Sequence, residues 1–443
     1  MLDQQLGDYT IVRQIGKGST GVVFEGKHRS NGGRAAIKVL HFRFSSAPEL
    51  LKCFMGANCG SSHPGLAWGS GRGELPDGRA YFIMDYLDGD TLAQRLARMG
   101  GRLEVEQALA IARQVSEALA VAHFQGVGHG DLRPQNIMLV NTTGKSQREQ
   151  ATIFDFGSIY LTAAAASSDK PPEQRQNATQ VLDKSDVYAL GGILHEMLMG
   201  ERPPSPLTSR ERLVRSIPMS PDAQFRYAEQ LGVDLAALLL LMLAEEPAQR
   251  PSMKEVTLEL LRLSYKVEYE ELIGLARALQ VEQFQAFFSN LFLLFYRQPW
   301  ADGASERQPP KLYAWPVINR IGHSNARRIT IGRDYHNDVV LRHPAVSKRH
   351  AYISRDEHGV WVVSDLGSHA GSRMGLKHIY TEQEVPLRVG RHITFGGINL
   401  LVVDAARLYS LLLLRIRNPD DDTDSILRDY HLGASGTDGT DLD

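Results

Sequence analysis

The strongest chemical signal near the start of the chain is a run of glycines spaced for contact with phosphate groups. The segment GKGSTGVV supplies Gly16, Gly18, Gly21 and Val23 in the order G-x-G-x-x-G-x-V. Glycine lets a backbone approach phosphates closely and turn its N–H groups toward them. Lys38 follows in AAIK, on the next predicted strand, where its ammonium could pair with the same phosphates.

Two polar motifs further along the chain complete a set of groups suited to nucleotide chemistry. HGDLRPQN contains Asp131 and Asn136, and FDFG contains Asp155. A glycine motif alone would be a weak signal, but these residues occur together in the order and spacing that ATP chemistry requires. The combination therefore predicts a site that binds and uses ATP.

This combination resembles the motifs of eukaryotic-like, bacterial-type serine/threonine protein kinases, over residues 8 to about 263. The resemblance implies an α+β bilobal protein-kinase fold, with a strand-rich first lobe and a helix-rich second lobe. Glycine-punctuated strands over 8–40 and helical spacing over 104–125 agree with that order. ATP and Mg²⁺ are the cofactors that the family uses, and its substrates are protein hydroxyl groups.

The resemblance also assigns a role to each polar residue. Asp131 would accept or orient the substrate hydroxyl, and Arg133, where the family usually carries lysine, would keep positive charge near the γ-phosphate. Asn136 and Asp155 would hold Mg²⁺, and Lys38 would position the phosphates. Little covalent chemistry is left for the protein, since catalysis in this family is positioning plus electrostatics.

Further matches concern adenine and the frame of the second lobe. Met84 falls at the gatekeeper position, and the backbone from Asp85 to Leu87 would hydrogen-bond adenine. The letters PPEQ are similar to the family's A-P-E segment. Asp186 and Arg250 match family positions that brace the second lobe.

Departures from the family pattern leave a second hypothesis open. Gly130 replaces the arginine that commonly docks a phosphorylated activation loop, and the segment after FDFG is short. The only acidic candidate to pair with Lys38 from helix C is Glu49, which sits earlier than the family spacing. The chain could therefore be an active kinase or an ATP-binding pseudokinase scaffold that acts through docking.

A second set of motifs lies in IGRDYHNDVVLRHPAVSKRHAYI and in the DLGS that follows. They resemble forkhead-associated (FHA) domains over about 313–409, which implies an all-β sandwich that binds phosphothreonine. Arg333 would offer charge-assisted bonds to phosphate, Ser347 a hydroxyl donor and Lys348 further positive charge. His350 is predicted to brace the loops rather than to touch the ligand.

The same region departs from its family beside the predicted phosphate site. His369 replaces a threonine that can touch phosphate and could itself do so, whereas Ala370 replaces the asparagine that grips the peptide backbone. The phosphate-binding part is thus predicted to be intact and the peptide-binding part altered. The alternative is a module that docks its partners without reading phosphate.

Composition limits the remaining function classes. The 443 residues are 43% hydrophobic and 23% charged with a net charge of −2, which predicts no nucleic-acid partner. The two cysteines, Cys53 and Cys59, cannot form a disulfide framework, which favours a reducing cytoplasm; a redox switch is the minor alternative. The first residues lack a signal-peptide pattern, and the longest apolar run, Leu235–Ala244, is about half the ~20 residues of a membrane span.

Changes in composition divide the chain into successive parts. We predict a kinase domain over 8–263, a helical extension over 264–297, a linker over 298–312, an FHA-like domain over 313–409 and an acidic disordered tail over 418–443.

The apolar end of the predicted extension, FQAFFSNLFLLFYR, is expected to pack on the kinase domain, with a homodimer interface as the alternative. Phosphothreonine partners would be other proteins or sites on the chain itself. The acidic tail is expected to be a solvated, disordered end; as the alternative, a phosphorylated Thr440, with an acidic residue three places later, could bind the FHA-like domain of its own chain or of a neighbour, since a flexible tether raises its effective concentration.

Overall fold

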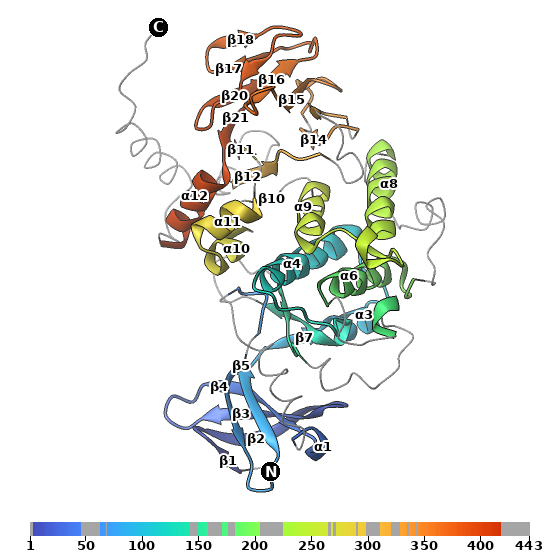
Figure 1. The fold of residues 1–443 in the computed structure, drawn as a ribbon, viewed down its shortest axis with the longest axis vertical. Coiled ribbons are helices and arrows are strands. Elements are labelled where there is room, and N and C mark those ends of the chain that lie inside the picture. The colour runs from blue at the N-terminus through green and yellow to red at the C-terminus, as the bar shows by residue number, and fades with distance from the viewer. Residues whose placement is uncertain are drawn as a thin grey trace. The chain divides into compact units, whose positions relative to one another are not determined.

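The computed structural model describes residues 3–45, 63–67, 69–141, 149–157, 171–175, 182–203, 225–264, 267–268, 272–288, 291–297, 311–319, 328–334, 336–341 and 343–417. They fall into two compact units, Met1–Pro221 with Leu235–Thr257 and Asp222–Asp234 with Leu258–Asp443 (Figure 1). Some predictions concern residues outside the described ones. These are the pairing of Glu49 with Lys38, the thiols of Cys53 and Cys59, most of the linker, and the tail with Thr440.

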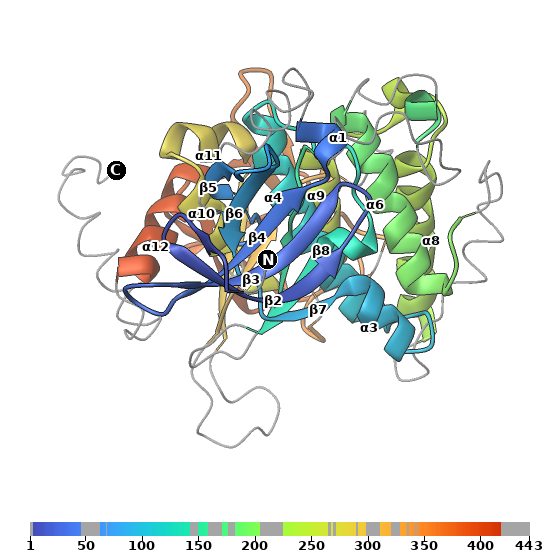
Figure 2. The same cartoon turned by 90° about the horizontal axis from the view of Figure 1, so that it is seen from below.

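The first unit begins with an antiparallel sheet of six strands in the order β1-β2-β3-β4-β6-β5 (Figures 1 and 2). Its strands are β1 (Gln5–Leu6), β2 (Tyr9–Lys17), β3 (Gly21–His28), β4 (Arg34–Leu40), β5 (Gly69–Glu74) and β6 (Ala80–Asp85), and a short helix α1 (Phe42–Ser45) follows β4. Alternation along the strands places Ile11, Phe24 and Ile37 in one buried cluster. The glycine motif turns the chain from β2 into β3, and Lys38 lies on β4.

The rest of the first unit is mainly helical. Its helices are α3 (Leu92–Arg98), α4 (Val105–Phe124), α6 (Leu182–Met199) and parts of α8 (Phe225–Met242) and α9 (Met253–Leu263), and a small sheet joins β7 (Gly89–Thr91), β8 (Ile137–Asn141) and β9 (Glu149–Ile153). Gly191 lets α6 approach its neighbour closely, because a Cβ there would lie 2.9 Å from the Cβ of Met242. Strands followed by helices confirm the predicted α+β bilobal arrangement.

The apolar run in α8 belongs to the core of this unit. Leu235, Leu238 and Leu239 are fully buried, as predicted for a core helix. Across the described ranges, no helix is both long enough and apolar enough to cross a membrane.

The second unit contains the predicted all-β sandwich. One sheet has seven strands in the order β10-β12-β11-β21-β20-β17-β18 and the other has five in the order β14-β13-β15-β16-β19. The strands are β10 (Val267–Glu268), β11 (Phe292–Arg297), β12 (Lys311–Pro316), β13 (Arg328–Gly332), β14 (Val339–Val340), β15 (Ala351–Arg355), β16 (Trp361–Asp365), β17 (Ser372–Met374), β18 (Lys377–Ile379), β19 (Val385–Pro386), β20 (His392–Phe395) and β21 (Ile398–Val403). Ile331 and Ile353 from the smaller sheet share a buried core with Phe395 from the larger one.

The prediction of a helical extension through residue 297 is wrong at its end. Helices α10 (Ile273–Ala278) and α11 (Val281–Phe287) are present, but β11 follows and lies inside the larger sheet, antiparallel to both β12 and β21. A short apolar run such as FLLFYR cannot be assigned to helix or strand from its periodicity. The neighbouring strands decide the outcome, and β12 likewise begins inside the predicted linker.

A final helix, α12 (Ala405–Arg417), covers the aromatic stretch and runs past the predicted boundary at 409. The hydroxyl of Tyr409 donates to the carbonyl of Leu279 at 3.0 Å, and its ring lies 5.2 Å from that of Phe284. Phe284 and Phe288 are buried in this way inside the second unit. The side chains that motivated the homodimer hypothesis therefore have partners within the unit, and the homodimer itself stays a prediction.

The segment 63–67, which leads toward β5, contains a buried histidine. His63 is 3% exposed; its Nδ1 accepts the N–H of Gly65 at 3.0 Å, and within the described chain its Nε2 has no hydrogen-bond partner. Burial penalises the charged imidazolium and lowers the pKa of His63 from 6.5 to about 4. The folded protein thus holds this side chain neutral across the mildly acidic range.

This depressed pKa predicts a loss of stability in mild acid. Between pH 6.5 and about 4 the unfolded chain binds a proton that the folded chain excludes. The free energy of unfolding should therefore fall as the pH drops through that window, by on the order of 3 kcal/mol from this group. We expect His63→Asn, which keeps an acceptor near Nδ1 but cannot titrate, to flatten the decline in urea titrations from pH 7.5 to 4.5. An unchanged slope in the variant would contradict this assignment.

Candidate active site

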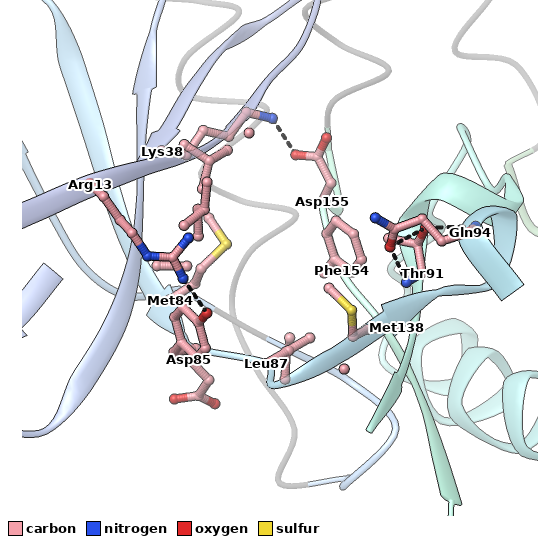
Figure 3. A pocket seen from close by; sticks show the side chains of 17 residues that line it. Arg13, Lys38, Met84, Asp85, Leu87, Thr91, Gln94, Met138, Phe154 and Asp155 are labelled. Atoms are coloured by element: carbon pink, nitrogen blue, oxygen red, sulfur yellow. Dashed lines mark hydrogen bonds and ion pairs between the residues drawn. The ribbon is translucent and has the colours of Figure 1, made fainter. Parts of the chain in front are cut away.

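A cavity of about 400 Å³ opens between the six-stranded sheet and the small β7–β8–β9 sheet of the first unit (Figure 3). Apolar side chains line it from both sides, with Val23 on β3, Ala36 on β4 and Met138 on β8. Such a slot suits a flat aromatic ring. The predicted nucleotide-binding residues that line it are Gly16, Val23, Lys38, Met84, Asp85, Leu87 and Asp155.

The two remaining glycines of the motif lie outside the cavity lining, and their surroundings differ. A Cβ on Gly21 would lie 2.2 Å from the carbonyl oxygen of Val39, so glycine is needed there for β3 to pack against β4. A Cβ on Gly18 would meet nothing within 4 Å, which leaves its backbone open to an approaching group. The close packing of β3 against β4 therefore explains why residue 21 is glycine, in addition to the predicted contact with phosphate.

At the charged end of the cavity, Lys38 and Asp155 form an ion pair (Figure 3). Lys38 is only 4% exposed, so a counter-charge offsets the cost of removing its ammonium from water. Asp155 adopts a positive φ of 69°, a conformation that non-glycine residues rarely adopt. Phe156, the next residue, is fully buried with its ring 4.7 Å from that of His129, which anchors the strained turn.

A buried carboxylate holds the loop that contains Asp131. Asp186, on α6, accepts the backbone N–H groups of His129 and Gly130 at 2.8 Å each and meets Nε2 of His123 at 2.8 Å. His129 in turn accepts the N–H of Asp131 at its Nδ1 and meets the carbonyl of Phe154 at its Nε2. Asp186 therefore braces the loop, and the loop is tied directly to the FDFG segment.

Within this loop the side chains of Asp131, Arg133 and Asn136 lie together, although none of them lines the cavity. Arg133 pairs with the carboxylate of Asp131 at 3.0 Å. The amide nitrogen of Asn136 donates to the backbone carbonyl of Asp131 at 2.8 Å, which leaves its amide oxygen available to another group. The carbonyl of Asn136 accepts the N–H of Phe154 at 3.1 Å, which places Asn136 beside the strand that ends at Asp155.

Gly130 has a conformational reason to replace the family's arginine. Its φ is +74°, in the left-handed region that glycine adopts without steric cost. The backbone N–H in that conformation is the one that Asp186 accepts. Glycine at position 130 therefore allows the backbone conformation in which this N–H donates to Asp186.

The PPEQ segment supplies a second buried brace. Arg250 is 2% exposed and donates to both carboxylate oxygens of Glu173 through its two terminal guanidinium nitrogens, at 2.7 and 2.9 Å. Burial alone would raise the pKa of Glu173, but hydrogen bonds from Arg250 and Ser185 outweigh it and hold that pKa below its usual value. The pair ties the short helix of residues 172–175 to the turn that precedes α9.

In the second unit, the predicted phosphate-reading residues lie on loops that meet one another. The hydroxyl of Ser347 accepts the N–H of His369 at 3.0 Å, and its carbonyl accepts the N–H of Arg333 at 3.0 Å. Asn337 donates to the carbonyl of Lys348 at 2.7 Å. These contacts bring together the loops that carry Arg333, Ser347, Lys348 and His369.

His350 braces these loops from within, as predicted. It is fully buried, accepts the N–H of Ser347 at its Nδ1 and meets the carbonyl of Gly371 at its Nε2. Burial lowers the pKa of His350 despite the nearby carboxylate of Asp365. Arg333 and Lys348 stay exposed, so this frame presents cationic groups to solvent.

Known families match both units. The family model of the protein kinase domain matches residues 9–259, more than half of the 443 residues, so this chain belongs to the protein kinase family. The model of the FHA domain matches residues 329–396. The protein-kinase fold and the FHA-type sandwich predicted from the motifs are thereby confirmed, and the family as a whole uses ATP with a divalent metal.

Relatives with curated names are bacterial serine/threonine-protein kinases. PknA of Mycobacterium tuberculosis is 35% identical over 214 residues, which cover 44% of this chain and 48% of PknA. Pkn1 of Myxococcus xanthus is 29% identical over 257 residues, which cover 55% of this chain and 36% of Pkn1. The chain thus spans about half or less of the length of these relatives. Among solved structures, the PknI kinase domain of M. tuberculosis is 29% identical with a TM-score of 0.47, over 58% of this chain and 96% of that chain.

The cavity also contains residues that the motifs did not predict. Thr91 and Gln94 form a capping box at the start of α3, with the N–H of Thr91 donating to the Gln94 amide oxygen at 2.8 Å. The letters T-x-x-Q before a helix could have indicated it. Arg13 and Tyr86 also line the cavity, and the guanidinium of Arg13 donates to the hydroxyl of Tyr86 at 3.3 Å; no local sequence signal predicts that long-range contact.

The positive φ of Gly130 leads to a stability prediction. We expect Gly130→Ala to lower the free energy of unfolding by about 1–2 kcal/mol, because a Cβ is disfavoured in the left-handed region. Gly18→Ala is the matched control, since its φ is not positive and a Cβ there meets nothing within 4 Å. Chemical denaturation of both variants measures the difference, and equal stabilities would contradict the conformational account of Gly130.

Proposed function

We propose that this chain is a serine/threonine protein kinase that transfers the γ-phosphate of ATP to protein hydroxyl groups. The observation that carries the proposal is the arrangement of the first unit. A slot for a flat ring ends at the Lys38–Asp155 pair, and the Asp131 loop is hydrogen-bonded to the same FDFG segment. The named relatives, which are serine/threonine-protein kinases, support the same activity.

In this proposal the chain's own residues position the nucleotide. The backbone between Asp85 and Leu87 meets adenine beside Met84, and the apolar walls exclude water from the ring. Lys38 neutralises charge on the α- and β-phosphates. Asp131 accepts the proton of the substrate hydroxyl or orients it, and its backbone is held for that task by His129 and Asn136.

The donor atoms near the phosphates fit Mg²⁺. Asp155 offers a carboxylate and Asn136 an amide oxygen whose nitrogen is already bonded, and hard cations of this kind take oxygen ligands. We propose these two residues as the protein ligands. The ion supplies charge neutralisation on the β- and γ-phosphates when bound. Arg133, which pairs with Asp131, adds positive charge near the γ-phosphate.

The second unit is proposed to recruit phosphothreonine, on other proteins or on the chain itself. Arg333 and Lys348 provide exposed positive charge, and the Ser347 hydroxyl and the His369 loop lie beside them. We propose that this module begins at β10, because β10 and β11 are both part of its larger sheet. The kinase domain is proposed to cover 8–263, and the scarcity of cysteine supports a reducing, cytoplasmic setting.

Asp131 provides the test of the kinase proposal. We expect Asp131→Ala to lower phosphate transfer from labelled ATP with Mg²⁺ by about 100-fold or more, since a positioned base typically contributes 10²–10⁴-fold. ATP affinity should change little, because Asp131 does not line the cavity. Transfer that persists in the variant, or that never occurs with the parent chain and any protein substrate, would overturn the proposal in favour of a scaffold.

Arg333 provides the test of the phosphate reader. We expect Arg333→Ala to weaken binding of a phosphothreonine peptide by about 10- to 100-fold, because a charge-assisted hydrogen bond is lost. Kinase chemistry should be unaffected. Arg355→Ala, at the opposite end of β15 from these loops, is the control. Unchanged peptide binding in Arg333→Ala, measured by calorimetry, would show that docking does not use the phosphate.

A further inference from the structure

The tip of the glycine turn between β2 and β3 is held by the residues that follow β4. The carbonyl of Gly18 meets Nε2 of His41 at 3.1 Å, and that of Ser19 accepts from the guanidinium of Arg43 at 2.8 Å. The next carbonyl, of Thr20, accepts the backbone N–H of His41 at 2.9 Å. Consecutive carbonyls of the turn therefore point at one short segment of chain, which we call the clamp, residues 41–43.

This contact determines where the amide groups of the turn point. In a trans peptide the C=O and the N–H lie on opposite sides of the peptide plane. When the carbonyls of Gly18 and Ser19 face the clamp, the N–H groups of Ser19 and Thr20 are turned away from it. In the part of the chain that the structure describes, neither N–H donates a hydrogen bond.

A free pair of adjacent N–H groups is a binding site for an anion. The turn connects strands that line the cavity, since Gly16 precedes it and Val23 follows it. Lys38, on the strand that leads to the clamp, brings positive charge to the same cavity. The anionic part of a nucleotide is the ligand that these groups suit.

We propose that His41 and Arg43 are positioning residues that orient the glycine turn for the phosphates of the nucleotide. They touch the carbonyl side of the turn, and they act by presenting the N–H groups of Ser19 and Thr20. The guanidinium of Arg43 also makes this a charge-assisted contact, which is stronger than one between neutral groups. The inference rests on the proposed kinase function, for which it names two further residues.

The test separates phosphate binding from adenine binding in the full chain. Dissociation constants for adenosine, ADP and ATP are measured by calorimetry for the parent chain and for Arg43→Ala and His41→Ala. We expect each variant to bind ADP and ATP about tenfold more weakly, because one hydrogen bond that orients the turn is lost. Adenosine affinity should stay the same, since the apolar slot is untouched.

Conservative variants and a matched control make the result specific. Arg43→Lys retains a cationic donor and His41→Gln retains a donor near Nε2, so both should recover part of the lost ATP affinity. Arg29→Ala, an exposed arginine at the end of the β3–β4 hairpin away from the turn, should match the parent chain. Thermal unfolding of each variant checks that the fold is retained.

The binding measurements decide whether the clamp orients the glycine turn. Equal loss of adenosine and ATP affinity, no loss for ATP, or no recovery in Arg43→Lys would overturn the clamp. A parent chain that binds adenosine and ATP equally would overturn it as well. A parent chain that binds ATP tightly, shows the selective loss in Arg43→Ala and yet transfers no phosphate would support the clamp and refute the proposed kinase activity instead.

Discussion

A buried ammonium must have a counter-charge, and the pairing of Lys38 with Asp155 meets this requirement where two sheets approach each other. The pair links β4 of the larger sheet to the segment that follows β9. From Asp155, Phe156 and His129 connect the pair to the loop that contains Asp131, which the buried carboxylate of Asp186 holds from α6. Each polar group along this series of contacts is partnered, so the positions of these side chains depend on one another. A change at any of these contacts would shift the loop relative to the cavity.

The FHA domain, which has an unrelated fold, likewise uses buried side chains to hold its loops and leaves other polar side chains exposed. Buried His350 and Asn337 hold the loop backbones through hydrogen bonds, while Arg333 and Lys348 remain exposed at the surface. The buried groups give the loops a defined shape at little cost, because their hydrogen bonds are satisfied. The exposed groups remain hydrated. In both units, the residues proposed to touch the ligand are therefore supported by buried residues that are not proposed to touch it.

Sequence reasoning predicted those parts of the site that lie within continuous motifs. The glycine turn, Lys38 and FDFG have set spacings, and the structure places Gly16, Lys38 and Asp155 at one cavity. Sequence reasoning did not predict contacts between residues that are far apart in the chain. The partner of Lys38, for example, lies 117 positions away. The clamp and the Arg13–Tyr86 contact are of the same kind, because only the folded sheet brings those side chains together. The strand β11 was missed for a different reason, namely that five apolar and aromatic residues followed by an arginine suit a buried helix equally well.

The place of β11 in the larger sheet determines which fragment of the chain can fold as an FHA domain. A piece cut at residue 313, the boundary that motifs alone indicate, would lack β11 and the first residues of β12. β21 would then lose the strand that pairs with it through residues 401–403, and its backbone N–H and C=O groups would face solvent along an open edge. Open edges of this kind pair with other molecules, so such a fragment would tend to aggregate during purification. A fragment that begins before β10 retains the sheet, the aromatic cluster and the helix α12 that covers it.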